Sequence, residues 1–310
     1  HQDRLTSDQN NPYNNQYWGG RINYGYDAKY LAELTFSYSG SEAFAKKNRY
    51  EFYPAAALGW IVSNEEFLKG NNTVNFLKVR TSAGLSGNSE LNERFSYRQL
   101  TTYYGDNYRF GTNANGYAGR TIGTLANPNL KAEKAFKFDF GVESQLFNSL
   151  YVNANYFFER RYDVLTNWDN IYSSITGISY PNVNYGVAFN YGLELQLNYE
   201  KQIDKDWSLS GNLNFLTYKN EIRKVLENPL PSNSLYQSKL GSIIGDELGL
   251  VAIGLFESEA DIASSPTQEF GTVNVGDIKY KDVNNDGVIN DYDRVWMGSY
   301  PIPNTEVGLT

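Results

Sequence analysis

Apolar and polar residues alternate along much of the chain with a period of two, the pattern that predicts β-strands. The alternation is clearest in the second half of the chain, within residues 136–143, 150–159, 191–200 and 207–215. Less regular strands are expected at about 20–26, 30–39, 51–62 and 76–85, and residues 306–310 begin another. Because successive side chains of a strand point to opposite faces, each strand would have one apolar face and one polar face.

The segments between these strands alternate in length. Short turns are expected at 27–29, 147–149 and 201–206, whereas the connections at about 39–50, 86–134, 160–189 and 219–303 are long and polar. Segment 63–75 departs from this alternation, because it stands where a short turn is expected but is fairly long. Transmembrane β-barrels have short periplasmic turns and long extracellular loops. We therefore predict an all-β, antiparallel transmembrane β-barrel, with apolar side chains toward lipid and polar side chains toward a wet lumen.

Nine or so strands do not close a large barrel. An open edge leaves backbone groups unpaired, and hydrocarbon cannot satisfy them, so further strands must come from elsewhere in a longer chain. Residues 1–4 lack the features of a signal peptide, and the last residues read as the beginning of a strand. We therefore expect residues 1–310 to be one part of the barrel, with connection 219–303 as an extracellular loop.

Composition and charge narrow the function classes. The 26 Tyr and 17 Phe residues fit a barrel with aromatic girdles, although a soluble β-sandwich would have a similar composition. The net charge of −8 argues against nucleic acid as a partner, and the lack of cysteine excludes disulfides and thiolate metal sites. The only histidine is His1, and the acidic residues form no convergent pair. We therefore expect no catalytic site, so that the chain is not an enzyme.

One acidic segment has the spacing of a calcium-binding loop, D-x-N-x-D-G-x-I-N-x-x-D. Oxygen ligands at its first, third, fifth, seventh, ninth and twelfth positions would be supplied by Asp282, Asn284, Asp286, Val288 (through its carbonyl), Asn290 and Asp293. Gly287 permits the sharp turn at the sixth position. The loop departs from an EF-hand, because Asp293 replaces the usual glutamate and no amphipathic helix flanks it. A structural Ca²⁺ is expected; an Asx-rich turn without metal is the alternative.

Several segments carry motifs that occur together in one protein family. Residues 126–133, ANPNLKAE, contain the pattern N-P-x-L-K-x-E before an expected strand. Residues 184–194, NYGVAFNYGLE, match N-x-G-x-x-x-N-x-G-x-E, and residues 254–256, GLF, precede the acidic loop. Near the front, segments 49–60 and 80–88 look like paired barrel strands. In this order over most of the chain, these segments resemble the C-terminal region of SusC/RagA-type TonB-dependent outer-membrane transporters of Bacteroidota.

The resemblance implies a barrel of about 22 strands with an N-terminal plug that lies outside this chain. It also implies active import of an oligosaccharide or oligopeptide across the bacterial outer membrane, driven by the TonB complex, with a SusD-like surface lipoprotein as a lid. Two other functions remain open from the residues. One is a soluble or surface-attached, calcium-stabilised β module for adhesion or glycan binding, and the other is a passive porin.

Overall fold

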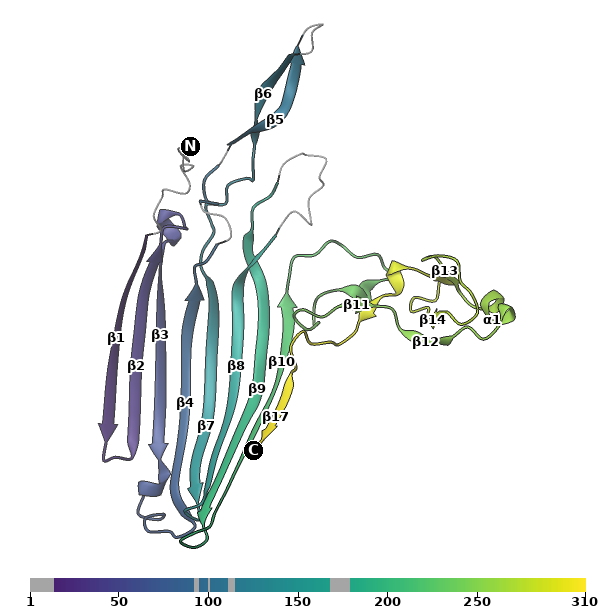
Figure 1. Cartoon of the computed structure of the whole chain (residues 1–310). Helices are drawn as coiled ribbons and strands as arrows, with labels where there is room; N and C mark the ends of the chain where they lie inside the picture. Colours follow the sequence, from purple (N-terminus) through teal and green to yellow (C-terminus); the bar gives the residue numbers. More distant parts are fainter. Residues whose placement is uncertain (1–13, 92–94, 100, 111–114, 168–178) are drawn as a thin grey trace.

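The fold is known from a computed structural model, which describes residues 14–91, 95–99, 101–110, 115–167 and 179–310. Within these residues, nine strands form one antiparallel sheet (Figure 1). Each strand of the sheet pairs with the next one along the chain, apart from the inserted strands described below. The nine strands are β1 (Asn15–Tyr26), β2 (Tyr30–Ser41), β3 (Tyr50–Ile61), β4 (Val74–Asn88), β7 (Glu133–Leu146), β8 (Leu150–Thr166), β9 (Val183–Gln202), β10 (Ser208–Lys224) and β17 (Thr305–Leu309). The expected all-β antiparallel architecture is confirmed, and the sheet is open at β1 and β17.

The cross-strand register continues one apolar face across the sheet. In one row Tyr30 pairs with Trp60, which pairs with Val79, which pairs with Val142. The intervening row places Lys78 opposite Glu143 and Ile61 opposite Lys78. Because the side-chain period of a strand is two, this register separates an apolar face from a mostly polar one. Large apolar side chains on the apolar face remain exposed, as at Leu58 (61%) and Leu193 (52%).

Two short turns have backbone conformations suited to tight hairpins. Asp27 and Ala28 have φ of 51° and 49°, and Phe147 and Asn148 have φ of 54° and 53°. Positive φ at both central residues gives the turn a twist that matches its flanking strands. Both turns were expected from sequence.

The longer connection after β3 is tied back to the same end of the sheet. Glu65 accepts hydrogen bonds from the Tyr30 hydroxyl (2.7 Å) and the Trp60 indole N–H (3.1 Å), and its carboxylate pairs with Lys29 (3.4 Å). Hydrogen bonding by Tyr30, then by Trp60, lowers the pKa of the Glu65 carboxyl. The exception that the sequence pattern required at 63–75 is therefore an ordered turn.

Several connections are shorter than their sequence suggested, because the strands extend further. The connection expected at 39–50 covers only residues 42–49, and the one expected at 160–189 shrinks to 167–182. Segment 89–132 contains a hairpin, β5 (Thr101–Phe110) and β6 (Asn115–Ile122), which the alternation did not reveal. The side chains of residues 101–110 and 115–121 lie outside the described residues. The alternation misses the ends of the longer strands, because these ends are polar.

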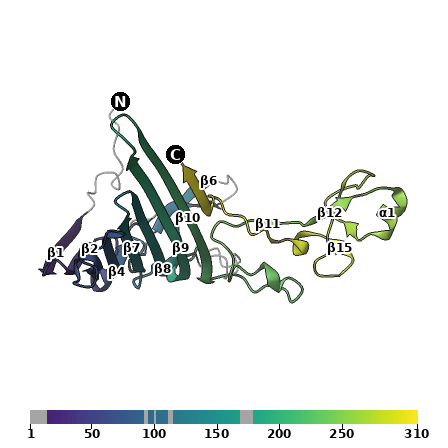
Figure 2. The same ribbon diagram turned by 90° about the horizontal axis from the view of Figure 1, so that it is seen from below.

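Residues 225–304 form an inserted segment that projects away from the sheet in both ribbon views (Figures 1 and 2). Its elements are short: β11 (Leu248–Gly249), β12 (Ala252–Leu255), α1 (Glu259–Ser264), β13 (Thr267–Gln268), β14 (Ile278–Tyr280), β15 (Val288–Ile289) and β16 (Val295–Trp296). Its base is held to β10 by backbone hydrogen bonds between Gly241 and Ile222 (2.7 Å) and between Ile222 and Ser242 (3.0 Å). We call residues 225–304 the loop segment.

Few hydrophobic side chains are fully buried among the described residues, and one cluster of them lies at the long-loop end of the sheet. Ala43, Phe44, Leu130 and Ala132 form a cluster against which Leu91 and Leu165 pack. A β-sandwich would instead bury one face of each of two large sheets, and the described strands show no second sheet of that kind. Among the described residues, no helix is long and apolar enough to span a membrane.

Candidate functional site

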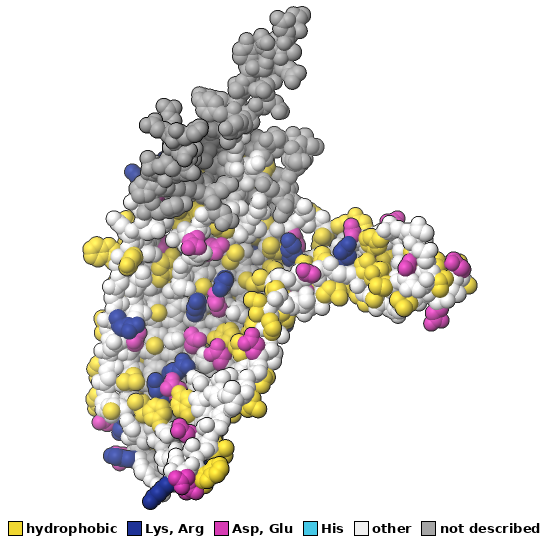
Figure 3. Space-filling model, viewed as in Figure 1, with side chains coloured by type: hydrophobic (Ala, Val, Ile, Leu, Met, Phe, Trp, Pro, Cys, Tyr) yellow, Lys and Arg dark blue, Asp and Glu magenta, His cyan; other side chains and the backbone are white. Residues whose placement is uncertain are grey.

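The polar face of the sheet carries paired charges at its centre. Arg80 Nε lies 2.9 Å from Glu143 Oε1, and Lys78 Nζ lies 3.7 Å from the same oxygen. Toward β1, Arg21 Nε lies 3.3 Å from Glu33 Oε1 across the β1–β2 pair. Figure 3 shows basic and acidic side chains distributed over the visible face of the sheet. Such a face is suited to water and polar solutes and unsuited to hydrocarbon.

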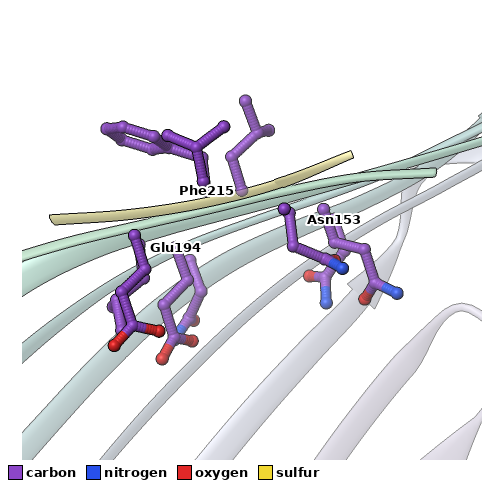
Figure 4. Close-up of a pocket in the computed structure, with 11 residues that line it drawn as sticks. Asn153, Glu194 and Phe215 are labelled. Carbon is purple, nitrogen blue, oxygen red and sulfur yellow. The ribbon is translucent and has the colours of Figure 1, made fainter. Parts of the chain in front are cut away.

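Near the β17 edge, the polar face carries side-chain amide and carboxylate groups. Figure 4 shows Glu194 and Asn153 on one side of the sheet and Phe215 on the other. Asn155 donates a hydrogen bond to Glu194 (3.4 Å). Both side chains line a hollow in the surface of the sheet, together with Gln196 on β9 and Asn214 on β10. The hollow borders the edge strand β17, where another strand of a complete barrel would pair. We therefore interpret it as wall surface that continues beyond this chain.

The predicted calcium loop is an ordered turn in which carboxylates accept backbone hydrogen bonds. Asp282 Oδ1 accepts from the N–H of Asn285 (2.7 Å), and its Oδ2 accepts from the N–H of Gly287 (2.9 Å). Asp286 Oδ1 accepts from the Val288 N–H (2.9 Å), and Asp286 Oδ2 accepts from the Asn284 amide (2.8 Å). Gly287 has φ of 84°, so the sixth position adopts the left-handed conformation that glycine favours.

The second half of the loop is closed by Asp293. This carboxylate is fully buried, and it accepts from the N–H of Val283 (2.9 Å) and of Asn290 (2.8 Å). Asn290 in turn accepts from the Tyr292 N–H (2.9 Å), and the side chains of Asn290 and Asp293 form a capping box with each other's backbone N–H groups around the short 3₁₀ turn Asp291–Asp293. One acidic side chain therefore joins the two halves of the loop.

The negative charge of the loop affects the pKa of Tyr236, which lies outside the loop. The Tyr236 hydroxyl donates to the Tyr292 carbonyl. Burial, followed by the charges of Asp293, Asp286 and Asp282, raises the pKa of Tyr236. All three carboxylates therefore lie close enough to Tyr236 to influence its pKa, although their residues lie up to eleven positions apart in the chain.

The chemistry of the oxygen ligands fits a hard cation only if neutral oxygens contribute. The described residues contain no group of three acidic, histidine or cysteine side chains placed to hold a metal ion. An ion in the loop would therefore rely on amide oxygens of Asn284 and Asn290 and on the Val288 carbonyl, besides carboxylate oxygens. Mixed oxygen sets of this kind are typical of Ca²⁺. Each carboxylate oxygen can also accept more than one interaction while it holds its backbone N–H.

An open antiparallel sheet with one exposed apolar face and one charged face defines the wall of a transmembrane β-barrel. The family model for the TonB dependent receptor-like β-barrel matches residues 2–309. The chain belongs to this family of outer-membrane proteins, as the sequence resemblance predicted.

Individual relatives agree with this assignment. TonB-dependent receptor P26 of Formosa agariphila is 31% identical over 301 residues, which are 94% of this chain and 29% of that protein. TonB-dependent receptor SusC of Bacteroides thetaiotaomicron is 31% identical over 210 residues, which are 66% of this chain and 20% of SusC. The chain therefore spans less than a third of these relatives.

Solved structures show the same fold. The structure of the RagAB peptide transporter has a TM-score of 0.72 and 21% identity over 96% of this chain and 31% of the matched chain. The RagAB peptide importer in its closed-closed state gives a TM-score of 0.70 and 20% identity. At these identities the likeness concerns the fold alone.

Proposed function

We propose that the full-length protein imports a nutrient actively across the outer membrane. The observation that carries this proposal is the family match over residues 2–309, combined with a sheet whose polar face bears charges such as Arg80 and Glu143. In this proposal the chain supplies barrel wall and extracellular loops, and its residues make and break no covalent bonds.

The finer parts of the proposal concern cargo, energy and partner. We propose an oligosaccharide or an oligopeptide as cargo, TonB as the source of energy, and a SusD-like lipoprotein as a lid over the extracellular side. Support comes from one sequence relative, SusC, which is named a TonB-dependent receptor, and from one structure of similar fold, RagAB, which is named a peptide importer. The amide-rich surface around Asn155 and Gln196 could hydrogen-bond either class of cargo, so it does not distinguish them.

Native mass spectrometry of the full-length protein, extracted gently from its own outer membrane, tests this proposal. The expected result is a complex with a surface lipoprotein and a bound glycan or peptide, whose mass identifies the cargo class. A chelator-washed sample is a useful control, since a lid that is held only through calcium would dissociate. A soluble species without lipoprotein would contradict the importer and favour a calcium-stabilised adhesion module.

For the acidic loop we propose a structural Ca²⁺ held by Asp282, Asn284, Asp286, Val288, Asn290 and Asp293. The support is the ordered conformation of the loop, with Gly287 in the left-handed region and the Asp293 carboxylate buried at its closure. The ion would stiffen the outer part of the loop segment, near β13 and β15, which pair in parallel there. Calorimetric titration of Ca²⁺ into chelator-treated full-length protein measures this binding directly.

A further inference from the structure

The apolar, lipid-facing side of the sheet carries a basic cluster at its long-loop end. Four exposed basic side chains belong to it: Arg160 on β8, and Lys219, Arg223 and Lys224 on β10. Tyrosine and phenylalanine residues of β8 and β9 lie between them. We call these four basic residues the outer basic cluster.

The register shows that the cluster lies on the face that meets lipid. Arg160 pairs with Phe189, which pairs with Glu221, and the row below joins Phe158, Tyr191 and Lys219. The row above joins Tyr162, Val187 and Lys224, next to a bulge that accommodates Arg223. The alternate rows, which include Glu159 and Asn190, belong to the polar face. Neighbouring strands lie about 4.8 Å apart, so the backbones of β8 and β10 lie about 10 Å from each other, within reach of long basic side chains.

The cluster also lies at the height of a membrane boundary. Arg160 follows Leu150 by ten residues along β8, and Leu150, Val152, Ala154, Tyr156 and Phe158 occupy the apolar face between them. At a rise of about 3.3 Å per residue and a tilt of about 40°, that stretch covers roughly 25 Å of membrane thickness. This height equals the apolar band of an outer-membrane barrel, which places Arg160 at the headgroup level.

Aromatic rings hold several of these cations in place. The Lys224 ammonium lies 3.9 Å from the centre of the Tyr185 ring, Arg223 lies over Phe189 (5.2 Å), and Arg160 lies over Tyr162 (5.6 Å). Glu221 neutralises part of the charge through its pair with Arg223 (2.9 Å) and is the only acidic residue in the three rows. A net positive surface remains, with rings between the cations.

We propose that the outer basic cluster binds the phosphate groups of a glycolipid in the membrane leaflet that faces the long loops. Guanidinium groups bind phosphate oxygens in a bidentate manner, and ammonium groups add charge. Acyl chains of the same molecule would lie along Phe158, Tyr191 and Leu193 below. Lone basic residues at membrane boundaries only extend their side chains toward water. Here four basic residues lie together and three of them contact aromatic rings, which makes a surface suited to an anionic group. The inference rests on the outer-membrane location of the family and is independent of the cargo.

The test uses the full-length protein in detergent, with purified lipid A as the probe and native mass spectrometry as the readout. The wild type is expected to retain lipid A, and the combined variant Arg160→Gln, Arg223→Gln and Lys224→Gln should retain it at least about tenfold less. The matched control, Lys201→Gln with Lys205→Gln, removes basic residues at the opposite end of the barrel. It should retain lipid A like the wild type.

Two further arms make the outcome decisive. Dephosphorylated lipid A should bind the wild type at least about tenfold more weakly, and phosphatidylglycerol should not displace phosphorylated lipid A. Equal binding of the dephosphorylated lipid, or preference for phosphatidylglycerol, would overturn the proposal. Because these arms use only the wild type, they decide the question even if the combined variant folds poorly. The substitution pair Arg160→Lys and Arg223→Lys keeps the charge but loses the bidentate guanidinium contacts, so its binding should lie between that of the wild type and that of the combined variant.

Discussion

At the scale of single residues, a substitution of Asp286 is the most direct test of the calcium proposal. Its carboxylate accepts from the Val288 N–H and from the Asn284 amide, and it stands at the fifth position of the loop. We expect Asp286→Ala to lower the melting temperature mainly when calcium is present. With free calcium about 100-fold above its dissociation constant, complete loss of binding would remove about 2.7 kcal/mol of stability. Thermal unfolding in calcium and in chelator measures the difference.

Asp291→Ala is the matched control for that measurement. Asp291 lies in the same loop but is 79% exposed and pairs with Arg294 at the surface, so its removal should have a small effect in either condition. If Asp286→Ala lost the same stability in chelator as in calcium, the loop would be an Asx-rich turn held by its own hydrogen bonds. The sequence predicted the ligand spacing; it did not predict that Asp293 would be buried while joining Val283 and Asn290.

At the scale of elements, substitutions in β9 test which face of the sheet meets the membrane. Leu195 pairs with Ala154 on β8 and with Phe215 on β10, near the middle of the apolar face. We expect Leu195→Arg to cost about 2–4 kcal/mol, because a charge at the bilayer midplane loses its hydration. Urea unfolding of the full-length barrel in lipid vesicles measures this cost. Gln196→Arg, one residue further and on the polar face, is the control and should be nearly neutral. A neutral result for Leu195→Arg would mean that the faces are assigned wrongly.

Strand β9 also illustrates which parts of the fold can be predicted from the sequence and which cannot. Regular alternation in residues 191–200 identified β9 and its faces, because one side meets lipid and the other meets water. Residues 183–190 were not predicted to be part of this strand. Tyrosine and asparagine near the membrane boundary make the two faces less different in polarity, so the alternation is weak there. The loop segment was predicted only as a long connection, and α1 with its Ser258 cap was missed, because six residues carry little periodicity. The outer basic cluster was also not predicted, since it exists only when β8 and β10 are aligned by β9.

At the scale of the whole molecule, the open edges at β1 and β17 mean that the wall is completed by strands outside this chain. A completed barrel of this family could be plugged or could be an open pore, and these alternatives differ in conductance. If the full-length protein is the proposed importer, we expect it to conduct little current in planar lipid bilayers, because its lumen would stay closed between transport events. The resemblance implies an N-terminal plug, and a full-length variant that lacks this expected plug should conduct steadily, since its polar wall, with Arg80, Lys78 and Glu143, would then line water. The plugless variant also serves as the control for insertion, because current from it demonstrates that barrels reach the membrane. Steady conductance of the intact protein, equal to that of the plugless variant, would contradict active import and favour a passive porin.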